Sequence, residues 1–136
     1  MKRDVRLFSP ETLSKPMGYS HVAEVSSGKL VYIAGQVALD AEGQLVGKDD
    51  FEQQLRQVFT NLRNALNAAG ASFGDVVKMN YFCSEQVDPS SIAVVRTVRD
   101  EYLNHAAPPV STFVFVSRLV RPEWLIEVEA VAVTAV

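Results

Sequence analysis

The sequence is poor in cysteine and histidine, and it carries no excess of basic residues. Its one cysteine, Cys83, can form no disulfide within the chain and argues against a cysteine-based metal site. His21 and His105 are far apart and lack metal-ligand spacing, so we expect no metal. Thirteen basic and sixteen acidic residues give a net charge of −3, with no basic stripe, which argues against a nucleic-acid partner.

Longer sequence signals are also lacking. No segment approaches the ~20 apolar residues of a membrane span, so we expect no membrane partner. Residues 1–4 are not followed by an apolar stretch long enough for a signal peptide. The chain has no phosphate-binding glycine loop and no Ser/His/Asp arrangement. These absences predict a cytoplasmic protein that works without a cofactor.

The chain has enough apolar residues to form the core of one domain over residues 1–136, because 48% of its residues are hydrophobic. The clearest element is a helix over Asp50–Ala69, whose apolar residues recur at spacings of three and four. An aspartate, Asp49 or Asp50, can cap its start, and Gly70 can end it. This helix therefore offers one apolar face for a sheet.

A second helix is predicted to begin at Asp88-Pro89 and to end before Pro108-Pro109. Strands are predicted in six segments: Val5–Phe8, His21–Ser26, Lys29–Ala34, Asp75–Cys83, Thr112–Arg118 and Trp124–Val136. The second and third would form a hairpin around Ser27-Gly28, and the last two a closing hairpin. This order predicts an α+β fold with both helices on one face of a mixed sheet.

The closing strands are apolar on both faces. Phe113 and Phe115 alternate with Val114 and Val116, and the last strand is similar. Two helices can cover only one face, and soluble monomers rarely leave a large apolar patch exposed. The pattern favours self-association. The alternative is that loops and the long N-terminal segment cover the second face.

Four charged residues lie in otherwise apolar segments. Glu127 and Glu129 share one face of the last strand, where burial would raise a carboxyl pKa into the range useful to a general acid or base. The alternative is that they face solvent or pair with Arg118. Arg96 and Arg99 lie in or beside the apolar stripe of the second helix and could clamp a carboxylate. The alternative is that their stems pack while their guanidinium groups reach water.

The order of these segments resembles the RidA/YjgF family, which includes reactive-intermediate (enamine/imine) deaminases. The resemblance runs from about Pro16 to Val133 and rests on Ile33-Ala34-Gly35-Gln36, Gly70, Asp75-Val76-Val77-Lys78 and Ile126-Glu127-Val128-Glu129-Ala130-Val131-Ala132-Val133. It implies a RidA-like (chorismate-mutase-like) fold and a homotrimer with a barrel-like core. It also implies that ligand pockets lie in clefts between subunits.

The resemblance also implies roles for particular residues. Tyr19 matches the tyrosine of the family pocket, although the usual Gly-Pro-Tyr reads Met17-Gly18-Tyr19. Gly35 matches the glycine whose backbone meets the ligand, and Glu127 matches the glutamate that positions the hydrolytic water. Ser111 stands where the deaminases carry the arginine of Pro-Ala-Arg-Ser. Arg96 stands at the family's pocket asparagine, and we hypothesise that it supplies the missing positive charge.

Two functions follow from these correspondences. In the first, the protein hydrolyses small enamines, imines or related carbonyl metabolites, with Glu127 orienting water and Ser111 or Thr112 binding the substrate. In the alternative, the trimer binds a small metabolite without turning it over, because the hydroxyl of Ser111 cannot form a bidentate pair with a carboxylate. Nuclease activity, attributed to some relatives, fits the acidic balance least.

Overall fold

The computed structural model describes residues 2–136, and its elements follow the predicted order closely. Its two helices are α1 (Phe51–Ala68) and α2 (Ile92–Asp100). Its strands are β1 (Asp4–Phe8), β2 (Val22–Ser27), β3 (Lys29–Gln36), β4 (Val76–Ser84), β5 (Val110–Val116) and β6 (Ile126–Thr134). Short 3₁₀ turns over Phe73–Asp75 and Pro89–Ser91 lead into β4 and α2.

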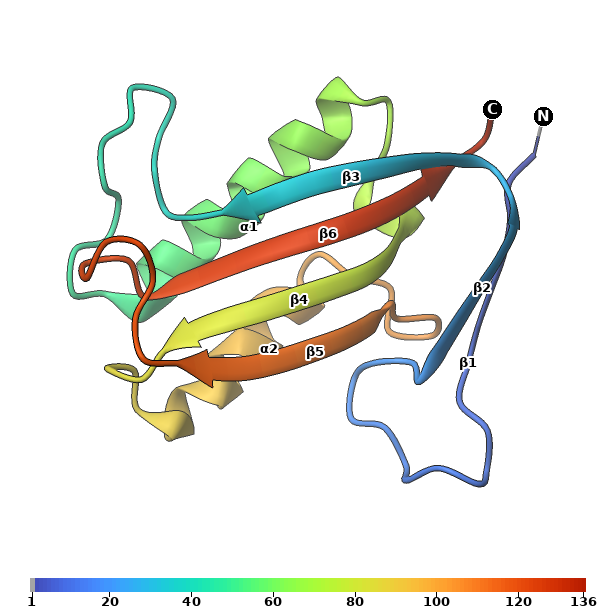
Figure 1. Ribbon diagram of the computed structural model, residues 1–136, viewed down its shortest axis with the longest axis horizontal. Helices are drawn as coiled ribbons and strands as arrows, with labels where there is room; N and C mark the ends of the chain where they lie inside the picture. Colours follow the sequence, from blue (N-terminus) through green and yellow to red (C-terminus); the bar gives the residue numbers. More distant parts are fainter. Residues whose placement is uncertain (1) are drawn as a thin grey trace.

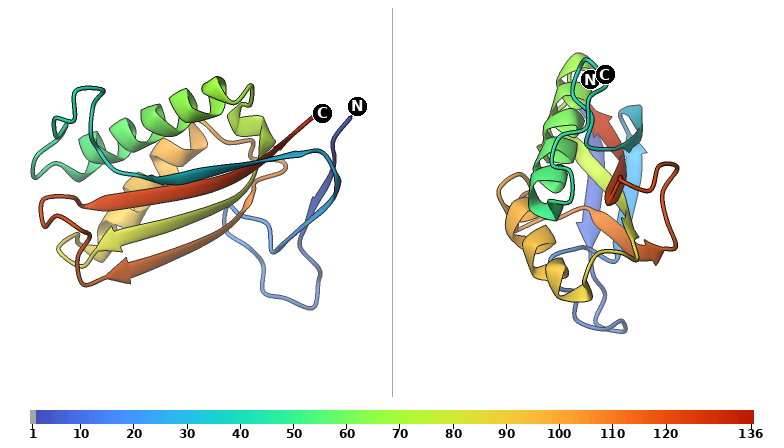
Figure 2. Two further views of the ribbon diagram at one scale, coloured as in Figure 1. Left: turned by 45° about the horizontal axis from the view of Figure 1, so that its top comes forward. Right: turned by 90° about the vertical axis from the view of Figure 1, so that its left-hand side faces the viewer.

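The main sheet has four strands in the order β3-β6-β4-β5. Only β4 and β5 run parallel, and the other pairs are antiparallel, so the sheet is mixed. Both helices lie on the same face of this sheet, and β1 and β2 form a separate two-stranded unit at one end (Figure 1). The end-on view in Figure 2 shows the opposite face without a helix. The predicted α+β fold, with two helices on one face of a mixed sheet, is confirmed.

Two predicted strand pairings are wrong. β2 pairs with β1, while β3 pairs with β6, so no hairpin forms around Gly28. Gly28 has a φ of 135°, and there the chain turns a corner between the two sheets. The closing hairpin is also absent, because β4 lies between β5 and β6 and pairs with both. Alternation along a strand fixes which side chains share a face, but not which strand lies alongside.

The predicted helix boundaries follow their local chemistry. The side chain of Asp50 accepts a hydrogen bond from the Gln53 backbone N–H at 3.0 Å and caps α1. Gly70 has a φ of 73°, which suits the left-handed turn after α1. The Asp88 carboxylate accepts from the Ser90 N–H at 2.9 Å, and this bond lowers the pKa of Asp88. Here a 3₁₀ turn precedes the regular helix α2.

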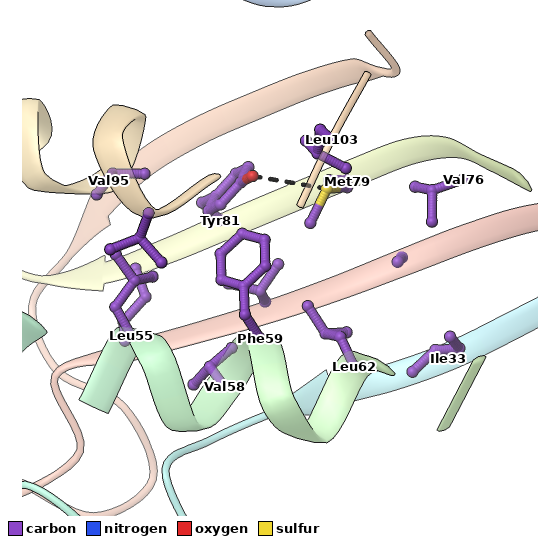
Figure 3. Close-up of a cluster of buried hydrophobic side chains, with 14 of the residues drawn as sticks. Ile33, Leu55, Val58, Phe59, Leu62, Val76, Met79, Tyr81, Val95 and Leu103 are labelled. Atoms are coloured by element: carbon purple, nitrogen blue, oxygen red, sulfur yellow. Dashed lines mark hydrogen bonds between the residues drawn. The ribbon is translucent and has the colours of Figure 1, made fainter. Parts of the chain in front are cut away.

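The core lies between α1, α2 and one face of the sheet (Figure 3). The α1 side chains Val58, Phe59 and Leu62 are fully buried against this face. Under them, the Tyr81 hydroxyl donates to the Met79 sulfur at 3.5 Å. Cys83, the next core residue on this face, is 1% exposed, and burial raises the pKa of its thiol to about 11. It is therefore a core side chain rather than a reactive thiol.

The face without helices remains partly apolar and exposed. Leu30 and Tyr32 of β3 are 52% and 74% exposed, and Val114 of β5 is 39% exposed. The described loops therefore leave this part of the sheet uncovered, against the alternative that they shield it. Within residues 2–136, neither helix is both long enough and apolar enough to span a membrane.

Candidate functional site

A hollow of about 500 Å³ lies between α2 and the edge strand β5. Helix α2 contributes one wall, the sheet residues on the helix-covered face form the floor, and the segment 15–19 closes one side. The lining residues are Lys15, Met17, Tyr19, Tyr81, Ile92, Val95, Arg96, Arg99, Ser111, Phe113 and Phe115. We call this hollow the α2–β5 pocket. It brings together three of the predicted site residues, Tyr19, Arg96 and Ser111.

The segment that carries Tyr19 is fixed by contacts with the chain just before β5. Ser20 donates its backbone N–H to the Pro109 carbonyl at 3.1 Å and its hydroxyl to the Pro108 carbonyl at 2.7 Å. The ring of Tyr19 meets that of His21 edge to face, with centroids 5.2 Å apart. These contacts join two segments about ninety positions apart, which no local sequence pattern predicts.

The charged residues that line the α2–β5 pocket are all cations: Lys15, Arg96 and Arg99. Arg99 is already engaged, because its Nε lies 3.1 Å from a carboxylate oxygen of Asp100. Its guanidinium also lies against Gly18, where a β-carbon would collide with it. Arg96 is exposed, and its side chain forms no hydrogen bond or ion pair within residues 2–136. The pocket therefore presents positive charge to an anion, with Arg96 the freer guanidinium.

A second group of predicted residues, Gly35 and Glu127, lies on the other face of the sheet. The Glu127 side chain lies directly over Gly35, and a β-carbon at residue 35 would overlap its carboxylate. Glu127 also lines a hollow of about 330 Å³ with Phe82, Val116, Arg118, Leu119, Val120 and Glu129. Burial, and then the charge of Glu129, raise the pKa of Glu127. Both effects disfavour the charged form of this carboxyl.

Glu129 has a different partner from the one that the sequence suggested. The Asn80 side chain donates to its carboxylate at 3.0 Å, whereas Arg118 donates to the carbonyls of Leu119 and Val120. The suggested pairing with Arg118 is therefore wrong. Asn80 lies beside Glu129 in the register of β4 and β6, and this could not be read without knowing that these strands pair.

Thr112 and Ser111, both predicted to bind substrate, lie on opposite faces of the sheet. It is exposed on the face without helices, where it lies opposite Asn80 in the register of β4 and β5. Neighbouring residues of a strand point to opposite faces, so only Ser111 reaches the α2–β5 pocket. One chain thus carries two groups of predicted site residues on opposite faces of its sheet, which we call half-sites: Tyr19, Arg96 and Ser111 in one, and Gly35 and Glu127 in the other.

Sequence reasoning did not assign several residues that line the α2–β5 pocket, among them Lys15, Tyr81 and Phe115. Phe115 could have been found, because alternation along β5 puts it on the same face as Ser111. Lys15 could not, since it reaches the pocket from an irregular segment. Within residues 2–136, no three His, Cys, Asp or Glu side chains gather as they would around a metal ion.

Comparison with known proteins shows which family shares this architecture. Residues 11–134 match the family described as endoribonuclease L-PSP. The crystal structure of a conserved Rid family protein of unknown function from Yersinia pestis is similar, with a TM-score of 0.85 and 37% identity. That match covers 95% of this chain and 98% of the other. The chain belongs to the RidA/YjgF family. The RidA-like fold expected from the sequence is confirmed.

Relatives of this RidA/YjgF protein occur in distant organisms. A RutC family protein of Pyrococcus horikoshii is 36% identical over 123 residues, or 90% of this chain and 92% of the relative. A 2-iminobutanoate/2-iminopropanoate deaminase of Dermatophagoides farinae is 29% identical over 108 residues, or 79% of this chain and 80% of that enzyme. The crystal structure of RidA from a Psychrobacter species has a TM-score of 0.68 and 34% identity, with 80% and 84% of the two chains covered.

Proposed function

We propose that this protein binds small 2-oxo, enamine or imine acids in clefts between the subunits of a homotrimer, and that it hydrolyses the nitrogen-bearing ones. The observation that carries the proposal is the α2–β5 pocket, where Arg96 and Ser111 lie with Tyr19. The deaminase named among the relatives supports an imine as substrate. An acid fits because the charged lining residues are cationic.

The carboxylate of the ligand would be bound from the helix rather than from the strand. Ser111 can donate one hydrogen bond, whereas Arg96 offers a planar fork of N–H donors that matches a carboxylate. The guanidinium of Arg96 has no partner among residues 2–136, so it can bind a ligand without first breaking a contact. On β5, Ser111 stands where the family deaminases carry an arginine. In this proposal, Arg96 on α2 supplies the positive charge that β5 lacks.

Glu127 would act as the general base. Its carboxylate takes a proton from water while the water oxygen bonds to the imine carbon. The proton then passes to the nitrogen, which gives a carbinolamine. The hydroxyl proton of the carbinolamine follows to the nitrogen as the C–N bond breaks, which releases ammonia and leaves the 2-oxo acid. Backbone N–H groups near Gly35 and Ser111 would bind developing negative charge. No metal is required, because the imine carbon is already electrophilic.

A second copy of the chain is needed to complete this site. The half-site with Glu127 and that with Arg96 lie on opposite faces of one sheet, so one chain cannot apply both to one ligand. The exposed apolar residues Leu30, Tyr32 and Val114 offer a surface for subunit contact. In the proposed trimer, Glu127 of one subunit faces Arg96 of its neighbour.

A coupled assay tests the proposed function. A lyase that generates enamines from serine is mixed with the protein, and release of ammonia or of the 2-oxo acid is followed. We expect acceleration that is lost in Glu127→Ala and reduced in Arg96→Ala. Without acceleration, thermal stabilisation by pyruvate that Arg96→Ala abolishes would favour the non-catalytic binding protein. Cleavage of added RNA by wild type and not by Glu127→Ala would overturn the proposal.

A further inference from the structure

The α2–β5 pocket carries an aromatic wall next to its cations. Tyr81 and Phe113 stack with centroids 5.6 Å apart, and Phe113 meets Phe115 edge to face at 5.6 Å. All three lie on the helix-covered face of the sheet, and all three line the pocket. The row becomes more open toward the edge of the sheet, from Tyr81 at 3% exposure to Phe115 at 40%.

The outer part of this aromatic row is available to a ligand. Phe115 keeps two-fifths of its surface exposed, although it lies beside Ile92 and Val95 of α2 in the pocket lining. An aromatic ring placed there would stack on or meet Phe115 edge to face, as Phe113 already does. It would also remove apolar surface from water. A three-carbon acid would leave the exposed ring of Phe115 in contact with water.

The size of the pocket agrees with a larger ligand. About 500 Å³ lies in the range of pockets that enclose drug-sized molecules, well beyond the needs of pyruvate or its imine. The same pocket also carries the groups that would anchor an acid. Arg96 can bind the carboxylate of the acid, and Ser111 can donate a hydrogen bond to its carbonyl. An aromatic acid would use both parts of the pocket.

We propose that the α2–β5 pocket selects 2-oxo and 2-imino acids with an aromatic side chain, binding the carboxylate at Arg96 and the ring against Phe113 and Phe115. This inference rests on the proposed function and adds the class of substrate to it. Branched aliphatic acids fill similar space without the ring contacts, so they bind more weakly.

The test is a calorimetric titration of the full-length protein with four compounds. Pyruvate carries only the anchor, 4-methyl-2-oxopentanoate adds a branched chain, phenylpyruvate adds the ring, and 4-phenyl-2-butanone has a ring without carboxylate. We expect phenylpyruvate to bind about tenfold more tightly than 4-methyl-2-oxopentanoate, and pyruvate and the ketone to bind more weakly still.

Variants assign the two contacts separately. Phe115→Leu keeps an apolar side chain but removes the ring, and it should weaken phenylpyruvate binding far more than pyruvate binding, so that most of the preference for phenylpyruvate is lost. Arg96→Ala should weaken all three acids about tenfold and leave the ketone unchanged. Phe8→Leu and Arg63→Ala make the same substitutions outside the pocket lining, and both controls should behave as wild type.

The outcomes separate this inference from the proposed function. Equal affinity for phenylpyruvate and 4-methyl-2-oxopentanoate, or a preference that survives in Phe115→Leu, would overturn aromatic selection and leave the proposed function standing. Failure of all three acids to bind would overturn the proposed function together with the inference. A wild-type preference lost only in Phe115→Leu supports the aromatic site.

Discussion

At the scale of single residues, the two carboxylates on β6 show how neighbours set chemistry. Glu129 accepts a hydrogen bond from the Asn80 amide, whereas the Glu127 carboxylate lies over Gly35 and accepts no hydrogen bond from residues 2–136. Glu127 is also half-buried and lies two positions from Glu129 on the same face. Both effects disfavour its charged form and raise its pKa.

The raised pKa of Glu127 makes a prediction about stability. A carboxyl with a higher pKa in the folded state binds protons more tightly there, so its contribution to stability falls as pH rises above the ordinary value of 4.5. Glu127→Gln removes this charge. We expect the variant to have a higher Tm than wild type at pH 8, and a difference that shrinks as the pH falls through the raised pKa of Glu127 toward 4.5.

Thermal unfolding followed by circular dichroism across this pH range measures the effect. Glu42→Gln, in an exposed loop, is the control and should show no comparable gain. A Glu127→Gln variant less stable than wild type at pH 8 would show that the carboxylate is stabilised in the fold, contrary to the direction of its pKa.

At the scale of elements, a buried glutamine ties α1 to the chain before β6. The Gln54 side chain is fully buried and donates to the carbonyls of Gly47 and Glu123 at 3.1 and 3.0 Å. Its carbonyl accepts from the Leu125 N–H at 2.9 Å. The sequence shows only a polar residue beside the apolar stripe of α1. Its role depends on the turn just before α1 and on a second loop, which reaches the helix from about seventy positions away.

Replacing Gln54 with leucine tests this connection. The change removes three hydrogen bonds and leaves the Glu123 carbonyl and the Leu125 N–H without a partner within residues 2–136, whereas the Gly47 carbonyl keeps a second donor at 3.0 Å. Each part-buried group left unpaired costs about 1–3 kcal/mol. We therefore expect Gln54→Leu to lower the free energy of unfolding by at least about 2 kcal/mol. Urea unfolding measures it. Gln53→Leu, its exposed neighbour on α1, should lie within about 0.5 kcal/mol of wild type. Similar stability for both variants would contradict the role of Gln54.

At the scale of the whole molecule, the apolar face of the sheet leads to a prediction about assembly. Tyr32 is 74% exposed and lies beside Val131 in the register of β3 and β6. If this face closes the proposed trimer, Tyr32→Lys places a charge in a desolvated contact and should yield monomers. Light scattering after gel filtration measures the mass. Asn64→Lys, on the exposed side of α1, should retain the wild-type mass.

The division of the site between two chains can be tested by complementation. Glu127→Ala and Arg96→Ala chains are produced together with different tags, and mixed trimers are isolated through both tags. Any mixed cyclic trimer contains one junction at which an intact Glu127 faces an intact Arg96. We expect about a third of the wild-type activity from mixed trimers, and little from either variant alone. Inactive mixed trimers would mean that both half-sites act within one chain.

The sequence by itself determined the local features. Apolar spacing located α1, an aspartate at position 49 or 50 and Gly70 marked its ends, and alternation correctly put Phe113 and Phe115 on one face of β5. These features depend on backbone geometry over a few residues, which repeats wherever the local sequence allows it. The family resemblance extended this to the whole chain.

Only the tertiary structure decided which segments meet. It put β4 between β5 and β6, brought the segment carrying Tyr19 to the start of β5, and separated Glu127 from Ser111 by a sheet. Strand pairing and pocket assembly depend on contacts between residues tens of positions apart, and a periodic pattern is compatible with several such partners. The chemical types of the site residues were readable in sequence, but their division into two half-sites was not.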